Sequence, residues 1–448
     1  MPSSNAFDRL WMPFTYYQDT VDYPPVVIEK GRGIYVYDKS GREIIDGVGS
    51  WWVSIFGHCH PHITAAVKNQ LNKIEHILMA GFISEPALRL SQLLGGLLPK
   101  ELTRIFYSDD GSTAVEVALK IALQYHALRE SKACEFVGLG SGYHGDTFGA
   151  MSVSSIPAYH SLFHERFKKH HSADSPYCYR CPKGKQPLTC MAECMDSLET
   201  IFKERGKRIA ACIFEPMVQG AAGMRVYPVK VLKKIFELCE QYNIVTIADE
   251  VAVGFGRTGK LFACAHAGKV PDIICLAKGL TGGYLPMGVT AVKEHIFEEF
   301  KDGPGSGRIL CHGHSFTGNP LAAAAACASM ELIRELNVPS TLDKLISRFK
   351  NGLESFREYA VVGDVRSIGL IGAIEFVKSN KSKEPFRASD RFAFTIAQKA
   401  LENGLLVRPL GDVLYFIPAF IITGEQIDAM FSILHRSIKE ILNARPAR

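Results

Sequence analysis

The chain has 448 residues, of which 47% are hydrophobic, so it can bury a large core together with a smaller one. Its formal charge of +5 is small for this length, and the basic residues are scattered among acidic ones, which argues against nucleic acid binding. No run of about 18 apolar residues predicts a membrane span, and residues 1–14 lack the apolar stretch of a signal peptide. Twelve dispersed cysteines are expected to be reduced, which favours the cytoplasm.

In chain order, residues 1–60 predict an irregular lead followed by short strands, such as that at Tyr35–Asp38. We expect this segment to contribute to a smaller domain and to the substrate pocket. Residues 61–330 alternate helical and strand patterns, for example helices at 63–74, 112–127 and 229–242 and strands at 104–107 and 211–214. This alternation predicts a large α/β domain with a mostly parallel sheet covered by helices on both sides.

Residues 331–448 predict a helix, then strands near 370–374, 406–408 and 413–416, and a final helix from Gly424. This order is typical of a smaller α+β domain. No segment rich in Pro and Gly separates it from the rest, so we expect the two domains to pack together.

Two polar residues follow apolar, strand-like runs. Asp249 ends the run Ile244–Ala248, and Lys278 ends Ile273–Ala277 just before a glycine-rich loop. The ends of parallel strands are where α/β enzymes place ligands. A lysine amine that forms a Schiff base, with a carboxylate that keeps a pyridine nitrogen protonated, is what a pyridoxal phosphate (PLP) enzyme requires. Either residue alone would be explained by surface ion pairing.

Three further segments can complete such a site. Ser108–Glu116 follows a strand and opens a helix, so Gly111 and Ser112 can cradle a phosphate, unless Ser108 or Asp109 merely caps the helix. Tyr143 lies between glycines and can stack on a planar cofactor, or it can occupy an ordinary turn. After the strand at 211–214, Gln219 can reach the phenolic oxygen of PLP, and Glu215 can brace a neighbouring loop.

Four cysteines form the pattern Cys178-x2-Cys181-x8-Cys190-x3-Cys194. Four thiolates could hold a structural zinc ion, but the second half departs from the tighter CxxC spacing. The alternative is a surface excursion with reduced thiols, and we predict no metal. The two histidines of His312–His314 have no obvious third ligand.

In this order the motifs resemble the class III aminotransferases, a subgroup of the fold-type I PLP enzymes. The resemblance rests on Asp249-Glu250-Val251, Gly254–Gly259, Lys278-Gly279 and Gly313–Pro320, and it extends from about Trp11 to Pro418. It implies an α/β fold of a large PLP-binding domain (61–330) and a smaller domain (331–448), in a homodimer.

Further motifs resemble the 7,8-diaminopelargonate (DAPA) synthases, a biotin-biosynthesis family that transaminates 8-amino-7-oxononanoate (KAPA). They are Trp11–Thr15, Gly49–Trp52 and Arg408–Gly411 with Tyr415 and Pro418. The resemblance implies that Lys278 is the Schiff-base lysine and proton shuttle, that Asp249 pairs with the pyridinium, and that Arg408 binds the KAPA carboxylate. The implied cofactor-binding residues are Gly111, Ser112, Tyr143, Gln219, Asp249, Lys278 and Ser315 of the partner subunit. The implied substrate-binding residues are Phe14, Trp51, Tyr143, Arg257, Lys278, Gly313, Arg408 and Tyr415.

Many members of this family have Tyr at the position of Phe14, which leaves the amino donor open. S-adenosylmethionine is the donor for most of them, and a lysine-using branch resembles this chain at Phe14 and at 282–286. Two other functions are weighed against this one. An ω-amino acid:pyruvate transaminase would share the fold, although Arg408 with Trp51 argues against it. A non-catalytic PLP-binding module is disfavoured because Lys278 and Asp249 are both present.

Overall fold

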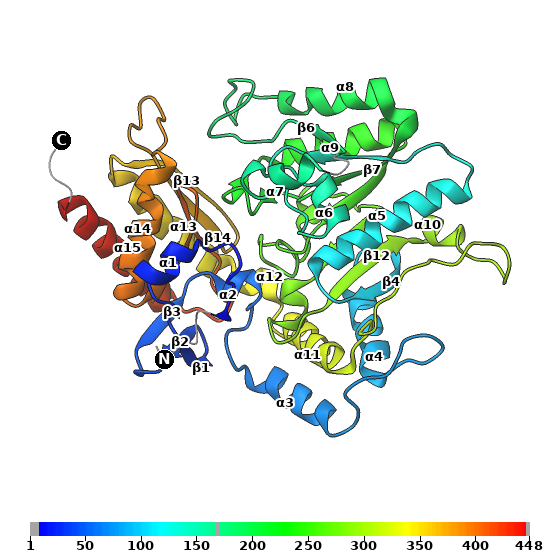
Figure 1. Cartoon of the computed structure of the whole chain (residues 1–448), viewed down its shortest axis with the longest axis horizontal. Helices are drawn as coiled ribbons and strands as arrows, with labels where there is room; N and C mark the ends of the chain where they lie inside the picture. Colours follow the sequence, from blue (N-terminus) through cyan, green and yellow to red (C-terminus); the bar gives the residue numbers. More distant parts are fainter. Residues whose placement is uncertain (1–8, 167–169, 445–448) are drawn as a thin grey trace.

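A computed structural model describes residues 9–166 and 170–444 (Figure 1). Residues 1–8, part of the segment in which no signal peptide is predicted, lie outside the described residues. The largest element is a seven-stranded sheet. Its strands, in spatial order, are β4 (Leu102–Ser108), β12 (Gly288–Lys293), β11 (Ile273–Leu276), β10 (Val245–Asp249), β7 (Ile209–Phe214), β5 (Glu135–Leu139) and β6 (His171–Ala173).

The sheet is mostly parallel, as the sequence predicts. Strand β12 is the exception, since it pairs antiparallel with both β11 and β4. Side chains alternate between the faces. On β7, Cys212 and Phe214 pack on one side of the sheet, and Ile213 packs on the other. Both faces are therefore apolar, and both are covered by helices.

The helix α5 (Gly111–Leu128) covers one face, and Ala114, Val117 and Ala118 on it belong to the core cluster of Ile213. Helices α4, α9 and α11 contribute to the core cluster that reaches the other face. The remaining helices of this part are short or lie at its margin. The bounds of these helices other than α5 are α3 (Pro61–Leu71), α4 (Glu85–Leu97), α6 (Phe148–Val153), α7 (Pro157–His164), α8 (Asp196–Arg205), α9 (Val229–Gln241), α10 (Glu294–Glu298) and α11 (Pro320–Glu335).

The C-terminal part contains the antiparallel sheet β13-β14-β17-β16 and the helices that pack on it (Figure 1). Its predicted strands and final helix are present. The elements are α12 (Val338–Thr341), α13 (Asp343–Glu354), β13 (Val362–Ile368), β14 (Ile371–Phe376), α14 (Phe392–Glu402), β16 (Arg408–Leu410), β17 (Val413–Phe416) and α15 (Gly424–Ala444).

The N-terminal segment joins this C-terminal part through a second sheet. Its strand β3 pairs in parallel with β15, with Ile45 opposite Leu405. The two ends of the chain thus share one sheet, which is how residues before 60 come to lie beside residues after 400. The elements are α1 (Tyr17–Asp22), β1 (Ile28–Arg32), β2 (Tyr35–Asp38), β3 (Glu43–Asp46), α2 (Gly49–Trp52) and β15 (Leu405–Leu406).

Candidate active site

A cavity of about 390 Å³ opens where the parallel strands of the large sheet end. Segments that follow five of these strands contribute to its wall, because the carboxyl ends of parallel strands meet at one edge. The lining includes Trp52, Gly111, Ser112, Tyr143, His144, Glu215, Asp249 and Lys278. The sequence motifs at Lys278, Asp249, Gly111, Ser112 and Tyr143 are therefore brought together in one place.

Asp249 is the last residue of β10 and is only 5% exposed. One carboxylate oxygen lies 2.7 Å from Nδ1 of His144, and the other accepts the N–H of Val251 at 3.1 Å. The opposite ring nitrogen of His144, Nε2, is buried without a partner among the described residues. These contacts hold the carboxylate in one orientation against the cavity.

Lys278 begins a short 3₁₀ turn directly after β11. Its backbone has φ of +40°, a left-handed conformation that is costly for a residue with a Cβ and that is often found at functional sites. Burial lowers the pKa of its ammonium below the ordinary value, although Asp249 and Glu215 act in the opposite direction. A lowered pKa favours the neutral amine, which is the nucleophilic form.

The N-terminus of α5 is arranged as an anion cradle. Asp110 caps the helix by accepting the N–H of Thr113 at 2.8 Å, while Gly111 and Ser112 line the cavity. Helix N-termini leave N–H groups without intrahelical acceptors, and these groups favour negative charge. A Cβ at Gly111 would lie 2.7 Å from the Val251 side chain, so only glycine fits there without displacing the wall. The caps predicted at Ser108 or Asp109 are wrong, because Asp110 caps the helix.

Tyr143 follows β5 and belongs to a polar cluster at the cavity mouth. Its hydroxyl donates to Asp146 at 2.8 Å, and the other Asp146 oxygen lies 3.2 Å from Nε2 of His160. The His160 contact is the main reason that the pKa of Asp146 is lowered. The Tyr143 ring stacks on His160 at 5.8 Å with 13° between planes.

Four side chains from distant segments form an aromatic and cationic group beside this cavity. The guanidinium carbon of Arg408 lies 4.1 Å from the centroid of the Trp51 ring, and the Phe14 ring meets Trp51 edge-on with 6.0 Å between ring centroids. The Tyr159 ring packs on Phe14 with 5.0 Å between centroids, and its centroid lies 6.4 Å from that of Tyr143. Arg408 has no ion pair with any described residue. The predicted substrate residues Phe14, Trp51 and Arg408 thus lie together, although Arg408 is far along the chain from the other two.

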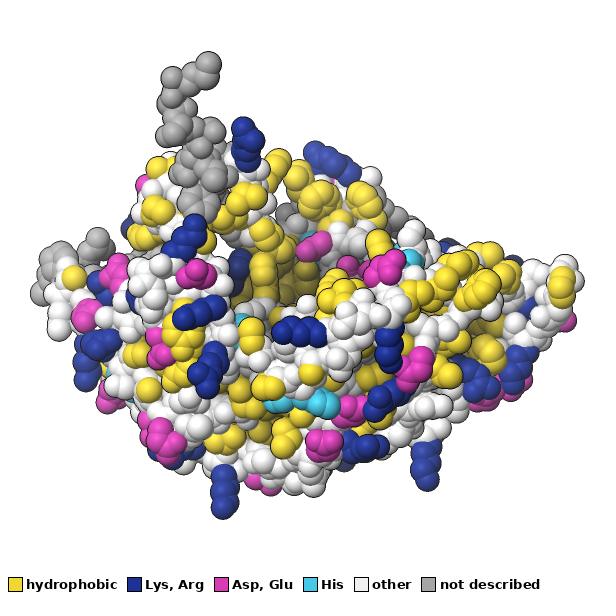
Figure 2. Space-filling model, turned by 90° about the horizontal axis from the view of Figure 1, so that it is seen from below, with side chains coloured by type: hydrophobic (Ala, Val, Ile, Leu, Met, Phe, Trp, Pro, Cys, Tyr) yellow, Lys and Arg dark blue, Asp and Glu magenta, His cyan; other side chains and the backbone are white. Residues whose placement is uncertain are grey.

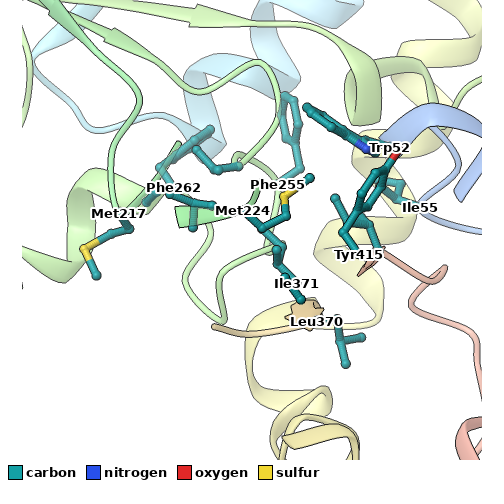
Figure 3. Packing of buried hydrophobic residues seen from close by; sticks show 14 of the residues in the cluster. Trp52, Ile55, Met217, Met224, Phe255, Phe262, Leu370, Ile371 and Tyr415 are labelled. Atoms are coloured by element: carbon teal, nitrogen blue, oxygen red, sulfur yellow. The ribbon is translucent and has the colours of Figure 1, made fainter. Parts of the chain in front are cut away.

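Trp52 and Tyr415 connect this group to Lys278. The Lys278 ammonium lies 5.0 Å over the Trp52 ring, and the Tyr415 ring meets Trp52 edge-on at 5.8 Å. Figure 3 shows the two rings side by side with Ile55 near them. The hydroxyl of Tyr415 is buried and has no hydrogen-bond partner among the described residues. Tyr415 therefore supports Trp52 from behind.

Gln219 and Arg257, which were predicted for the site, do not line the cavity. Gln219 is buried, and its amide is bonded within the protein, with Nε2 donating to Gly140 O and Oε1 accepting from Ser175. Arg257 is 1% exposed and donates through Nη1 to Pro418 O. Burial lowers the pKa of Arg257 to about 9. Both residues lie behind the wall, so their roles in cofactor or substrate binding stay predictions.

Gly313 and Ser315 are exposed and belong to a loop beside the start of α5. The neighbouring His314 approaches Asp109 at 2.8 Å, which fixes the loop near the anion cradle of the same chain. Neither Gly313 nor Ser315 lines the cavity of its own chain. Their roles in cofactor and substrate binding therefore stay predictions.

The structure adds residues that the sequence did not single out for the site, namely His144, Asp146, Tyr159 and His160. It also shows what Glu215 does, since its carboxylate accepts the N–H groups of Tyr143 and Gly220. This is the loop brace that the sequence suggested. Burial raises the pKa of Glu215 to about 7. The motif Gly142–Thr147 marked His144 and Asp146 only as neighbours of Tyr143, and nothing local marked Tyr159.

The four clustered cysteines lie between β6 and α8. All twelve cysteines of the chain are free, and burial together with the other three thiols raises the pKa of Cys194 to about 12. Among residues 9–166 and 170–444, no group of three or more His, Cys, Asp or Glu side chains is placed to hold a metal ion.

Within these same ranges, no helix has the length and apolar character needed to cross a membrane.

Comparison with known proteins identifies the family. The model of the family described as aminotransferase class-III matches residues 16–438. The chain belongs to the class-III aminotransferases. It is 41% identical over 437 residues to an adenosylmethionine-8-amino-7-oxononanoate aminotransferase of Anoxybacillus flavithermus, covering 97% of this chain and 96% of that relative. A relative with the same name from Geobacter sulfurreducens is 40% identical over 436 residues, with the same coverage.

Solved structures agree with this assignment. The crystal structure of the adenosylmethionine-8-amino-7-oxononanoate aminotransferase of Methanocaldococcus jannaschii has a TM-score of 0.91 and 36% identity, over 97% of both chains. A PLP-bound amine transaminase from an uncultivated Pseudomonas species has a TM-score of 0.92 and 33% identity, over 96% of this aminotransferase and 98% of that chain. The predicted fold class is therefore confirmed.

Class-III aminotransferases use PLP, and the residues of this cavity fit it. The α5 cradle at Gly111 and Ser112 suits the phosphate, and the oriented Asp249 carboxylate suits a protonated ring nitrogen. His144, with its unpartnered Nε2, adds a second polar group on that side. Lys278 is the lysine that lines the cavity, so its amine is the group available to the aldehyde.

Proposed function

We propose that this aminotransferase transfers an amino group to 8-amino-7-oxononanoate and forms 7,8-diaminononanoate, with S-adenosylmethionine as donor. The names of the relatives support this substrate pair. The single structural observation that carries the proposal is Arg408, a half-buried guanidinium that has no carboxylate partner among the described residues and lies 4.1 Å over the Trp51 ring. The acceptor has an anionic end on an aliphatic chain, and this group offers a cation beside aromatic walls.

Each protein group has a task in this proposal. Arg408 binds the acceptor carboxylate through two parallel N–H donors, and Phe14, Trp51 and Tyr159 exclude water from the aliphatic chain. Asp249 holds a proton at the ring nitrogen. Lys278 moves a proton between the substrate carbon and the cofactor. When bound, PLP supplies a carbonyl that accepts the amino group and a ring that stabilises negative charge.

The geometry also supports a long acceptor. Lys278 lies over Trp52 and Arg408 lies over the adjacent Trp51, so the acceptor can extend from the lysine toward the guanidinium along the two indoles. Arg408 has no carboxylate partner among the described residues, and an acceptor whose carboxylate reaches it would supply one.

The test of this function is product formation. Purified protein with PLP is incubated with KAPA and S-adenosylmethionine, and separately with KAPA and lysine, and DAPA is measured by mass spectrometry. DAPA in the first mixture is expected. DAPA with lysine alone would keep the acceptor and change the donor, and no DAPA in either mixture would contradict the proposed acceptor.

We also infer that the active form is a homodimer. Exposed apolar side chains of 71–88 form one surface with Phe316, since His76 contacts the Phe316 ring at 5.1 Å and Met79 lies against Gly318. The exposed members are Leu71, Ile74, Leu78, Met79, Phe82, Ile83, Leu88 and Phe316. Figure 2 shows hydrophobic side chains gathered on the face that is seen from below, around a hollow. Contiguous apolar patches of this kind mark interfaces.

A second copy on this surface would bring Ser315 close to the phosphate cradle of the other subunit, as the family resemblance implies. Light scattering of the wild type should give a dimer, and Phe82→Asp with Phe316→Asp should give a less active monomer. A wild-type monomer with full activity would contradict the inference.

We also propose that the protein is located in the cytoplasm, since the free thiols of all twelve cysteines are in keeping with a reducing compartment.

A further inference from the structure

Residues 49–52 (α2) form a left-handed turn. Gly49, Ser50, Trp51 and Trp52 have φ values of 55°, 46°, 67° and 77°. Three of these residues carry a Cβ, and each pays a steric cost in this conformation, so such runs are rare. A Cβ at Gly49 would lie 2.7 Å from Ile417 O, so the turn is pressed against the chain that follows β17. The surrounding structure must therefore hold the turn in place.

A buried carboxylate does so. Asp46 is 3% exposed, and its two oxygens serve the segment that leads into the turn. Oδ2 accepts the Ser50 hydroxyl at 2.8 Å and lies 3.0 Å from Nε2 of His58, while Oδ1 accepts the N–H of Val48 at 3.2 Å. The acid thus connects the first strained residue with a side chain beyond the turn. Hydrogen bonds to a charged acceptor are the stronger kind.

The turn sends two consecutive indoles to different parts of the site. Trp51 is 39% exposed and lies under the Arg408 guanidinium, whereas Trp52 is 5% exposed and lies under the Lys278 ammonium. The position of the turn therefore fixes the distance between the acceptor end and the reacting end of the site. Relaxing the turn at Ser50 would move the half-exposed Trp51 away from Arg408, whereas Trp52 stays against Lys278 because it is buried and packed on the Tyr415 ring.

We infer that Asp46 and Ser50 are positioning residues for the amino acceptor: their hydrogen bond holds the strained turn that keeps Trp51 beneath Arg408. This inference rests on the proposed function for the identity of the acceptor. The other end of the site, with Asp249 and the α5 cradle, is held by separate contacts. Losing the brace should therefore weaken acceptor binding and spare the donor half-reaction.

The test uses Asp46→Asn and Ser50→Ala in the holoenzyme. The matched controls are Asp38→Asn and Ser40→Ala, which break the same type of Asp–Ser contact (2.6 Å) in the exposed turn that joins β2 to β3. In both test variants the apparent KM for KAPA should rise about ten- to a hundredfold, as expected for a lost hydrogen bond to a charge. The rate of the donor half-reaction should stay within about twofold of wild type, and the controls should be unchanged in both measurements.

A second readout does not depend on turnover. The chain has three tryptophans, so Trp11→Phe leaves only the two indoles of the turn. Nonanoate, which has the acceptor's chain and carboxylate but neither its ketone nor its amino group, is titrated in this background by tryptophan fluorescence. Asp46→Asn and Ser50→Ala should shift the emission and weaken nonanoate binding by the same factor as KAPA.

If Asp46→Asn does not fold, Ser50→Ala and Ser50→Gly decide the question. Glycine adopts the left-handed conformation without strain, so Ser50→Gly keeps the fold while removing the hydroxyl. Because glycine removes the strain together with the hydroxyl, Ser50→Gly should keep more nonanoate affinity than Ser50→Ala. Unchanged emission and nonanoate affinity in Ser50→Ala would overturn the inference, as would equal damage to both half-reactions. A wild-type protein that binds nonanoate but does not convert KAPA would contradict the proposed function. The role of the Asp46–Ser50 hydrogen bond would then still be decided by the nonanoate titrations.

Discussion

The two ends of the active site are built differently. The cofactor end consists of residues that directly follow strands of one parallel sheet, such as Asp249 after β10 and Lys278 after β11. The acceptor end is assembled from the two termini of the chain, with Trp51 and Phe14 from the N-terminal segment and Arg408 from β16. Asp249 is 5% exposed, whereas Trp51 is 39% and Phe14 is 51% exposed. In the proposed function, the cofactor chemistry lies at the edge of the buried sheet, and the selection of the acceptor lies in a less buried region.

The largest effect is expected from the cofactor end. Lys278→Ala should remove the covalent attachment of PLP and lower the turnover rate by at least about 10³-fold, because proton transfer also depends on this amine. Absorbance spectra of the purified variant and steady-state rates measure both effects. Lys269→Ala, which changes an exposed lysine paired with Glu240, is the control and should behave as the wild type. Wild-type turnover by Lys278→Ala would remove Lys278 from the site.

Asp249→Asn should retain PLP but lose at least about 10²-fold in turnover, because an amide cannot hold the ring proton as a carboxylate does. The contact with His144 gives the substitution a second visible effect, since the buried imidazole loses its charged partner. Cofactor content by absorbance and steady-state rates separate binding from chemistry. An unchanged rate with a full complement of PLP would show that Asp249 is structural.

Arg408→Ala separates the acceptor end from the cofactor end of the site, because it should slow only the half-reaction of the acceptor. Losing a bidentate, charge-assisted contact should raise the apparent KM for KAPA about ten- to a hundredfold and leave the donor half-reaction intact. Arg408→Lys should recover part of the loss, since an ammonium lacks the planar fork. Single-turnover kinetics with each substrate measure the two halves separately. Equal damage to both halves would assign Arg408 to the fold or to the donor.

The smallest effect concerns pH and stability. Burial raises the pKa of Glu215 to about 7, so the folded protein binds this proton more tightly than the unfolded chain does. Stability should therefore fall as the pH rises from about 4.5 to 7, by up to about 1.4 kcal/mol per pH unit from this group. Glu215→Gln should flatten that slope in denaturant titrations of the holoenzyme at several pH values. An identical slope in wild type and variant would show that Glu215 does not contribute to it.

The contrast between the two ends also explains what the sequence could predict. An apolar run is followed at once by a polar motif at Lys278, at Asp249 and at the start of α5. The local pattern predicts a strand end at each of these places, and strand ends are where α/β enzymes bind ligands. The pairing of β3 with β15 joins residues about 360 positions apart, and a local sequence pattern cannot predict such a pairing. Tyr159 was missed for this reason, since only folding brings it against Phe14. The antiparallel direction of β12 was missed because a strand's apolar pattern does not depend on its direction.

The left-handed turn at 49–52 was invisible for a different reason. A sequence of Ser50, Trp51 and Trp52 has no residue that prefers positive φ, so local preference predicts the opposite of what is found. The conformation is imposed by Asp46 and by the chain after β17. Local preference and structure disagree here at a turn that we infer positions the acceptor, and conflicts of this kind are expected at functional sites.

In the proposed function, Arg408 recognises the carboxylate of the acceptor. The most direct measurement compares KAPA with its methyl ester as acceptors for the wild type and for Arg408→Ala, with kcat/KM determined for all four combinations. The wild type should prefer KAPA about ten- to a hundredfold, and Arg408→Ala should lose this preference, because the ester and the substitution remove the same contact. A preference that survives intact in Arg408→Ala would show that another group reads the carboxylate.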